Sequence, residues 1–301
     1  MPNNKTSPTF KVTSLGCPKN LVDSEIMIGL MGQSGFRVVP TDQPAQVHII
    51  NTCSFVGDAK SESIDHILSA SQTKKEGGIS LLVVTGCLPQ RYQKKISRLL
   101  PEVDLFVGTG DYERLPTLIA QKLIGTKKRN FIHQQQFLPT HLTPRVQSTA
   151  FYTKYVKISE GCSHQCSFCI IPTIRGKLLS RQPEDIVQEI KTGVASGIRE
   201  FNLVAQDLNE YGRDLTPKSS LNQLLKLTSD IKGDYWIRLL YMYPLQFPDR
   251  LIDTIADHPH VARYVDIPLQ HISDHLLKKM RRGSSRRYIM RLIDQLKNKI
   301  P

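Results

Sequence analysis

Residues 155–169 read YVKISEGCSHQCSFC, and this stretch does most to decide the fold and the chemistry of the chain. Its first part, Tyr155–Ser159, has the composition of a β-strand. Three cysteines with the spacing CxxxCxxC follow the strand directly: Cys162, Cys166 and Cys169. Three thiolates can hold one small metal cluster, whereas a 4Fe-4S cluster needs four ligands. The motif therefore predicts a cluster with one iron left open for another ligand.

Two other interpretations of this motif stay open at the level of sequence. A zinc ion could be bound by the three cysteines and His164, or the thiols could pack as small hydrophobic groups. Zinc motifs usually pair two CxxC knuckles, which favours the iron-sulfur cluster. His164 lies between two of the cysteines, and we expect it beside the cluster or exposed rather than as a ligand.

The first part of the chain repeats one pattern three times. An apolar run that ends in a cysteine occurs at 10–17, 47–53 and 81–87. Helix-like segments lie between the runs, so the pattern predicts parallel strands with crossover helices. Loops that follow parallel strands meet at one edge of a sheet, which predicts a second open cluster at Cys17, Cys53 and Cys87. The alternative is that these cysteines are core residues, because cysteine is often buried for packing alone.

The second part of the chain also alternates strands with helices. Strands are expected at 155–159, 201–205, 236–241 and 264–267. Helices are expected at 183–196, 221–231, 248–258, 273–281 and 286–300. Four βα units predict a parallel sheet, but even a partial barrel of six strands would need two more. We therefore expect an α/β chain that is truncated at its C-terminus, or whose last strand needs cover from another chain.

Composition divides the chain into two domains. We expect an N-terminal domain at 9–127, a linker rich in Gln, Pro and Thr at 128–150, and an incomplete partial barrel at 151–301. Residues 271–301 hold nine basic and two acidic side chains, more than half of the net charge of +13. The run KKMRRGSSRR at 278–287 could hold RNA phosphates, although a charge run is usually a solvated surface.

The sequence disfavours secretion and membrane insertion. The start, MPNNKTSPTF, is polar, and no stretch of 18 apolar residues occurs. We therefore expect a cytoplasmic protein with no membrane partner. In a reducing compartment, six cysteines are more typical of metal ligands or catalytic thiols than of disulfides.

Several motifs resemble those of the radical SAM methylthiotransferases. The CxxxCxxC after a strand is similar to the radical SAM superfamily, and SLGCPKNLVDSE, NTCSF and VTGCLPQ resemble the methylthiotransferases. The segments KISEGCSHQCSFCIIP, RGKLLSR, AQDLNEYG, YMYP and DIPLQHISD resemble the branch that modifies a ribosomal protein. The related tRNA enzymes typically have SSHP in place of YMYP and LPVQSGS in place of IPLQHIS. The resemblance covers residues 9–301.

The resemblance implies a mechanism with two 4Fe-4S clusters. The open iron of the cluster in the second domain would bind S-adenosyl-L-methionine, and one-electron reduction would release a deoxyadenosyl radical. This role makes three cysteines the catalytic candidates: Cys162, Cys166 and Cys169. The N-terminal cluster would hold the sulfur that is methylated and transferred. The implied acceptor is the β-carbon of an aspartate in ribosomal protein S-twelve, which is too inert for acid-base chemistry.

The resemblance also implies partners. These are the ribosomal protein, alone or on the ribosome, and an electron donor such as flavodoxin or ferredoxin, with the enzyme acting as a monomer. The family's C-terminal TRAM module and the last strands of its barrel, which help to bind S-adenosylmethionine, are expected to be missing here. One alternative is a tRNA adenosine methylthiotransferase, which the net charge and the shared cluster layout leave open. Another is a metal-stabilised RNA-binding protein without catalysis.

Polar residues near the predicted strand ends are candidates for cofactor binding. Those we assign to S-adenosylmethionine are Gln206, Arg238, Gln270, Arg175 and Arg181. Further candidates for cofactor or substrate are Asp207, Tyr241 and Ser180. Arginine suits this role because its guanidinium can bind a carboxylate through two hydrogen bonds. The alternative for each residue is a helix cap, a solvated loop or a structural ion pair.

Overall fold

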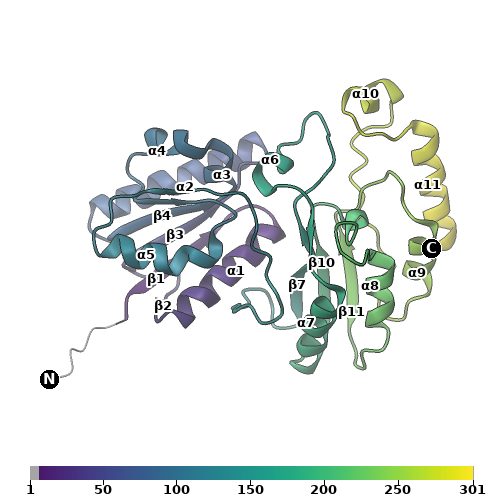
Figure 1. The fold of residues 1–301 in the computed structure, drawn as a ribbon, viewed down its shortest axis with the longest axis horizontal. Helices are drawn as coiled ribbons and strands as arrows, with labels where there is room; N and C mark the ends of the chain where they lie inside the picture. The colour runs from purple at the N-terminus through teal and green to yellow at the C-terminus, as the bar shows by residue number, and fades with distance from the viewer. Residues whose placement is uncertain (1–6, 301) are drawn as a thin grey trace. The chain divides into compact units, whose positions relative to one another are not determined.

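The computed structural model describes residues 7–300 and divides the chain into two compact units. Unit 1 runs to Phe137 and also contains Thr143–Ser148 and Thr173–Arg175. Unit 2 contains Leu138–Leu142, Thr149–Pro172 and the chain from Gly176 onward. Each unit is built on a parallel sheet with helices, so the predicted α/β class is confirmed (Figure 1). No helix in the described part of the chain combines the length and the apolar character needed to cross a membrane.

Unit 1 contains a six-stranded parallel sheet with the strand order β2-β1-β3-β4-β5-β6. Its strands are β1 (Thr9–Ser14), β2 (Arg37–Val38), β3 (Val47–Thr52), β4 (Leu81–Gly86), β5 (Leu105–Val107) and β6 (Asn130–Phe131). Its helices are α1 (Pro18–Gln33), α2 (Gly57–Lys75), α3 (Cys87–Tyr92), α4 (Ile96–Leu99) and α5 (Leu115–Leu123). The three apolar runs that end in cysteine form β1, β3 and β4, which pair in parallel as the sequence predicts.

Helices cover both faces of this sheet (Figure 1). Ile49 and Val83 pack with residues of α1 and α5, whereas Ile50 and Val84 pack with residues of α2, α3 and α4. Successive side chains of a strand point to opposite faces, so a sheet covered on both faces needs uninterrupted apolar runs. This requirement explains why β3 and β4 read as VHIINT and LLVVTG rather than as alternating strands.

The segment expected to be a linker, 128–150, is in large part folded onto unit 1. Strand β6 lies within it and pairs with β5 at the edge of the sheet. Further along, the Arg145 guanidinium forms a 2.5 Å ion pair with Glu25 of α1. A strand of two residues leaves no periodic signal in the sequence, which is why the composition alone indicates a linker.

Unit 2 contains a three-stranded parallel sheet with the order β11-β10-β7 and a small antiparallel pair, β8 and β9. The strands are β7 (Thr153–Lys157), β8 (Ser159–Glu160), β9 (Leu179–Ser180), β10 (Glu200–Val204) and β11 (Trp236–Leu240). The helices are α6 (Ile171–Arg175), α7 (Pro183–Ala195), α8 (Leu221–Thr228), α9 (Asp249–Asp257), α10 (Asp274–Lys279) and α11 (Arg286–Lys299). The five helices expected from α7 onward are therefore confirmed.

The fourth strand expected in unit 2, Tyr264–Ile267, does not form, although all of its residues are described. The neighbouring residue Val261 makes only an isolated parallel bridge to Ile237 of β11. At Asp266 the backbone carbonyl accepts from Met242 and the carboxylate accepts from the backbone N–H of Tyr241. A side chain thus takes a backbone donor that a regular strand ladder would have used, and Pro268 can donate no hydrogen bond further on.

The two faces of the β11-β10-β7 sheet differ in polarity. Phe201 and Leu203 of β10 belong to a core that also contains residues of α7, α8 and α9. On the opposite face the row of paired residues is Tyr155, Asn202 and Arg238. One face of this sheet is apolar and packs on helices, and the other face is polar. This pattern is typical of a barrel wall whose interior carries a functional site.

Candidate metal centres

In unit 1 the first three cysteines follow the carboxyl ends of neighbouring parallel strands. Cys17 caps the N-terminus of α1, Cys53 follows β3, and Cys87 is the first residue of α3. Gly16 has a φ of +89°, and a Cβ at this position would lie 2.6 Å from Cys53 Cβ and 3.0 Å from its Sγ. Only glycine allows the Cys17 loop to pass this close to Cys53.

The thiols of unit 1 lie within electrostatic reach of one another. Burial raises the pKa of Cys87 to about 11, the Arg175 guanidinium lowers it, and Cys53 and Cys17 raise it further. The parallel topology thus brings the three thiols together, as the sequence predicts. Burial favours the protonated form of the Cys87 thiol, whereas a bound metal would stabilise its thiolate. Metal binding by these residues stays a prediction.

Asn20 of α1 ties the loops of this group together. Its side-chain Nδ2 donates to the backbone oxygens of Leu15 and Thr52, both at 2.9 Å. Its Oδ1 accepts a hydrogen bond from the Arg175 guanidinium at 2.5 Å and lies 3.8 Å from Cys87 Sγ. One buried amide therefore fixes the ends of β1 and β3 and contacts the third cysteine.

Arg175 is 2% exposed and lies in the part of α6 that belongs to unit 1. Its guanidinium donates to Asp23 Oδ2 at 2.7 Å, to Asn20 Oδ1 and, at 3.5 Å, to Cys87 Sγ. The sequence suggests Arg175 as a ligand of S-adenosylmethionine, whereas the structure places it against the N-terminal cysteines. Asn20 and Asp23 were not among the candidates, and only their place in SLGCPKNLVDSE points to them.

In unit 2 the CxxxCxxC loop connects β8 to α6. The backbone N–H of Cys162 donates to the oxygen of Gly176, and that of Cys169 donates to the oxygen of Cys166, both at 3.1 Å. Mainly because of burial, the pKa of Cys162 is raised to about 11. A backbone hydrogen bond from His164 lowers this pKa, whereas the negative charges of Asp207, Cys169 and Cys166 raise it. The three thiols thus gather in one compact loop.

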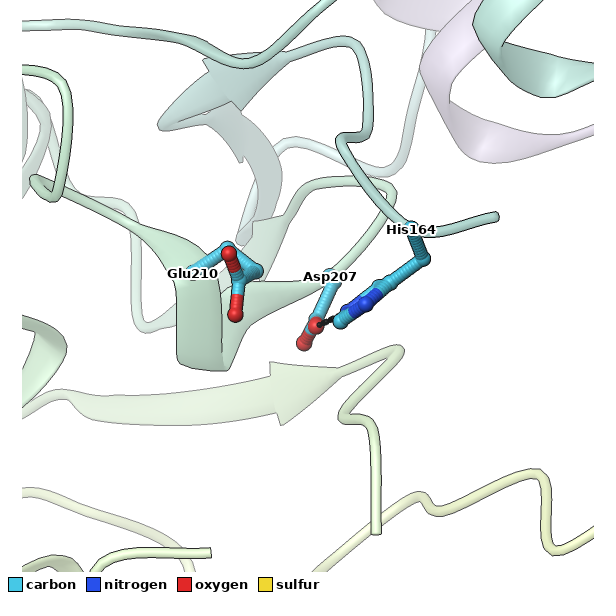
Figure 2. A group of neighbouring side chains, drawn as sticks. All are labelled: His164, Asp207 and Glu210. Carbon is cyan, nitrogen blue, oxygen red and sulfur yellow. Dashed lines mark hydrogen bonds and ion pairs between the residues drawn. The ribbon is translucent and has the colours of Figure 1, made fainter. Parts of the chain in front are cut away.

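His164, within this loop, is held by two residues from later in unit 2. Its Nε2 lies 2.7 Å from Asp207 Oδ2 (Figure 2). Its ring stacks on Tyr243, with 4.0 Å between the ring centroids. Asp207 also accepts backbone hydrogen bonds from Asn209 and Tyr243. These contacts fix the orientation of the imidazole beside the loop, and they are compatible both with a neighbour of a cluster and with the zinc-ligand alternative.

Glu210 completes a group with His164 and Asp207 in which the potential ligand atoms lie within 4.8 Å of one another (Figure 2). The Glu210 carboxylate, however, pairs with Arg213 at 2.7 Å. Asp207 already accepts three hydrogen bonds. Because both carboxylates already have protein partners, the group does not require a metal ion to satisfy them.

Two of the predicted cofactor residues lie on the polar side of unit 2. Gln206 follows β10, and its Nε2 donates to Glu160, whose other oxygen pairs with Lys157 at 2.8 Å. Arg238 of β11 pairs with Glu200 at 3.0 Å and lies over the ring of Tyr264. Both residues therefore have protein partners and still lie on the side expected to bind a ligand.

The other predicted cofactor residues of unit 2 have different surroundings. Arg181 is buried and pairs with Asp185 and Glu189 of α7, at 2.6 and 2.7 Å. Gln270 is exposed, with a positive φ of 70°. The contacts of Arg181 correspond to the structural ion pair that the sequence leaves open as the alternative.

Buried polar atoms with no hydrogen-bond partner among the described residues lie close to Cys53 and Cys87 in sequence, and others lie in unit 2. In unit 1 they are Asn51 Oδ1, Ser54 Oγ and Thr85 Oγ1, each within two residues of Cys53 or Cys87. In unit 2 they include Ser159 Oγ, Gln206 Oε1 and Asn209 Oδ1. Folded proteins leave few such atoms, and clusters of them mark sites that take up a polar ligand. The thiol donors and these atoms therefore fit an iron-sulfur cluster in each unit and a polar cofactor in unit 2.

Two family models match the chain. Residues 9–108 match the model described as "Uncharacterized protein family UPF0004". Residues 156–301 match the model described as "Radical SAM superfamily". The first match contains the three cysteines of unit 1, and the second contains those of the CxxxCxxC loop.

Two solved radical SAM enzymes share the fold. The methyltransferase TsrM from Kitasatospora setae, solved with cobalamin and a [4Fe-4S] cluster, aligns with a TM-score of 0.66 and 13% identity, over 97% of this chain and 68% of that one. The cobalamin-dependent enzyme OxsB aligns with a TM-score of 0.65 and 11% identity, over 96% of this chain and 48% of that one. At these identities the likeness supports the fold alone. Together with the two family models, this fold confirms an N-terminal parallel-sheet domain followed by a radical SAM domain.

Curated relatives match along nearly the whole chain. "Ribosomal protein uS12 methylthiotransferase RimO" of Geobacter sulfurreducens is 47% identical over 96% of this chain and 65% of its own length. The proteins of the same name in Citrifermentans bemidjiense and Akkermansia muciniphila are 45% and 43% identical, over 67% and 69% of their lengths. The chain thus spans about two thirds of the length of these relatives. Both cysteine groups and all the motifs lie inside the matched region, and the chain belongs to the RimO family of radical SAM methylthiotransferases.

Proposed function

We propose that this chain transfers a methylthio group to ribosomal protein S-twelve, the activity for which its relatives are named. The finer proposal is that the acceptor is the β-carbon of an aspartate. The observation that carries the proposal is the presence of a thiol triad at the carboxyl edge of a parallel sheet in each unit. A radical SAM enzyme with one cluster needs only one such triad.

Each triad has a role in this proposal. Cys162, Cys166 and Cys169 hold the 4Fe-4S cluster that binds S-adenosylmethionine, and the triad of unit 1 holds a second one. When bound, the clusters and S-adenosylmethionine supply one-electron chemistry and a transferable sulfur, which acid-base side chains do not provide. The chain's own residues fix the geometry: Asn20 and Arg175 hold the unit 1 loops, and His164 and Asp207 hold the CxxxCxxC loop.

Cofactor binding falls to the polar side of unit 2. The partnerless Oε1 of Gln206 is available to accept a hydrogen bond from a ligand, and Glu160 and Lys157 hold the side chain in place. Arg238 and Gln270 complete the proposed binding set for S-adenosylmethionine. The observed partners of Arg175 and Arg181 support structural roles for these two residues instead. The proposal further includes a cytoplasmic monomer that takes electrons from a flavodoxin or ferredoxin.

Mass spectrometry of the ribosomal protein tests this function. A strain that lacks the gene should contain S-twelve without its methylthio increment, and the wild-type gene should restore it. Genes with either cysteine triad changed to Ala should fail to restore it, whereas an exposed variant, Arg199→Ala, should succeed. An increment that persists in the deletion strain would contradict the proposal. A nucleoside digest of tRNA that loses its methylthio-adenosine instead would favour the tRNA alternative.

A further inference from the structure

Arg282 of unit 2 is a buried cation that has no carboxylate partner among the described residues. It is 4% exposed and follows the end of α10. Its guanidinium donates to the backbone oxygen of Pro268 at 2.7 Å and to Cys166 Sγ at 3.5 Å. Its Nε is buried and has no hydrogen-bond partner in the part of the chain that the structure describes. Of the two groups that accept hydrogen bonds from this guanidinium, Cys166 is the one that could carry a negative charge and balance it.

Tyr243 holds Arg282 in this position. The guanidinium lies over the Tyr243 ring, 3.9 Å from its centroid, and the Tyr243 hydroxyl donates to the backbone oxygen of Arg282 at 2.6 Å. The same hydroxyl lies 3.8 Å from Cys166 Sγ. Because Tyr243 contacts both the guanidinium and the backbone of Arg282, it holds the charge of the arginine beside the cysteine loop.

The segment before Arg282 is attached to the same loop. The backbone N–H of Ser167 donates to the oxygen of Met280 at 3.1 Å, and its hydroxyl donates to the oxygen of Lys279 at 2.9 Å. Ser167 directly follows Cys166. The end of α10 and the CxxxCxxC loop therefore form one hydrogen-bonded assembly within unit 2.

A buried cation without a counter-charge is unfavourable, because its hydration is lost without replacement. Thiolates that ligate a metal carry the missing negative charge, since metal binding requires deprotonated cysteines. Arg282 is therefore placed to balance the charge of the proposed ligand Cys166.

We propose that Arg282 is a positioning residue that provides the positive counter-charge for the cluster at Cys162, Cys166 and Cys169 and raises its reduction potential. The inference rests on the proposed function, in that it needs a 4Fe-4S cluster in this loop. Reduction transfers one electron from an external low-potential one-electron reductant to the cluster and adds one negative charge there. A fixed cation that donates to a ligand sulfur stabilises the reduced form more than the oxidised form.

A redox titration followed by electron paramagnetic resonance measures this effect. The parent is the full chain with Cys17, Cys53 and Cys87 changed to Ala, so that only the cluster of unit 2 contributes. It is reconstituted anaerobically and titrated with titanium(III) citrate. We expect R282Q to make one-electron reduction about tenfold less favourable, a potential about 59 mV more negative. We expect R282K, which keeps the charge and loses the planar contacts, to fall between the two.

Arg281 offers a matched control, because it is the exposed neighbour of Arg282 in the same turn. R281Q removes the same charge and should leave the potential of the parent unchanged, since solvent screens an exposed charge. If R282Q retains the iron of the parent and has the same potential, the inference is overturned. If R282Q loses its iron, recovery of the iron by R282K supports it, and failure of a folded R282K to recover iron overturns it. A parent without any cluster would overturn the proposed function as well, which separates the two failures.

Discussion

The guanidinium of Arg175 donates to Sγ of Cys87 at 3.5 Å, although 88 residues separate the two in sequence. The same guanidinium forms a 2.7 Å ion pair with Asp23, and both side chains are 3% exposed. Arg175 comes only six positions after Cys169 in the sequence, yet it contacts one of the N-terminal cysteines. This arrangement makes Arg175 part of the support of unit 1.

Arg175→Gln is expected to destabilise unit 1 strongly. The change removes the cation that balances the buried Asp23 carboxylate, and breaking a buried pair from one side typically costs about 3–5 kcal/mol. Urea unfolding followed by circular dichroism measures the loss. The control is Arg199→Gln, whose pair with Asp234 is exposed and whose loss should cost less than about 1 kcal/mol. Equal effects of the two substitutions would show that Arg175 does not support unit 1.

Gly16→Ala should reduce both stability and iron binding by unit 1. The new Cβ would lie 2.6 Å from Cys53 Cβ, so the Cys17 loop would have to move away from Cys53. Gly35→Ala is the matched control, because Gly35 has a φ of +84° and a Cβ added there would meet no atom within 4 Å. Both variants bear the cost of a positive φ, about 1–2 kcal/mol. Only Gly16→Ala should also lose iron, and an equal iron content in the two proteins would contradict the geometry.

His48 should make the stability of unit 1 depend on pH. Burial, and then the charges of Lys11 and His66, lower the pKa of His48 to about 4, below the unfolded value of about 6.5. Between these values the unfolded chain binds a proton that the folded chain does not, so stability falls as the pH drops from about 6.5 to about 4. The slope is at most about 1.4 kcal/mol per pH unit.

Urea unfolding at pH 7 and pH 5 measures this dependence. His48→Gln removes the titrating group and keeps a polar partner for Thr13, which lies 2.9 Å from His48 Nε2. The variant should lose less stability between the two pH values than the wild type does. The same loss in both proteins would assign the pH dependence to other groups.

Gln206→Ala is expected to weaken S-adenosylmethionine binding about tenfold, the equivalent of one hydrogen bond of about 1.4 kcal/mol. The reason is the buried Oε1 of Gln206, which has no protein partner. Arg181→Lys should bind the cofactor as the wild type does, because Arg181 is engaged by Asp185 and Glu189. Equilibrium dialysis of the reconstituted proteins compares the two. Weaker binding by Arg181→Lys alone would reverse the assignment.

The sequence predicts the sheet of unit 1 and the meeting of its cysteines because both follow from local pattern. Three apolar runs that end in cysteine can pair in parallel only with their cysteines at one edge. The strand expected at Tyr264–Ile267 does not form, and one reason is a tertiary contact, the hydrogen bond from the Tyr241 backbone to the Asp266 carboxylate. No local pattern contains that contact.

Three arginines, Arg175, Arg181 and Arg282, also show that the sequence alone does not reveal tertiary partners. Arg175 and Arg181 both read as cofactor ligands, because arginine near a strand end suits a carboxylate. The structure gives both of them carboxylate partners from the chain itself. Arg282 lies in a basic run that reads as solvated surface, yet it is buried against Cys166, 116 residues away. Partners at such separations are set by the fold and leave no spacing that a motif search could detect.

The central claim is that two separate thiol triads each hold a cluster. The most direct test is to measure iron and sulfide content after anaerobic reconstitution. The wild type should bind roughly eight irons. The variant with Cys162, Cys166 and Cys169 changed to Ala should bind roughly four, and so should the variant with Cys17, Cys53 and Cys87 changed to Ala. Roughly four irons in the wild type, and none in the first variant, would contradict the account, because the cysteines of unit 1 would then be core residues without a metal.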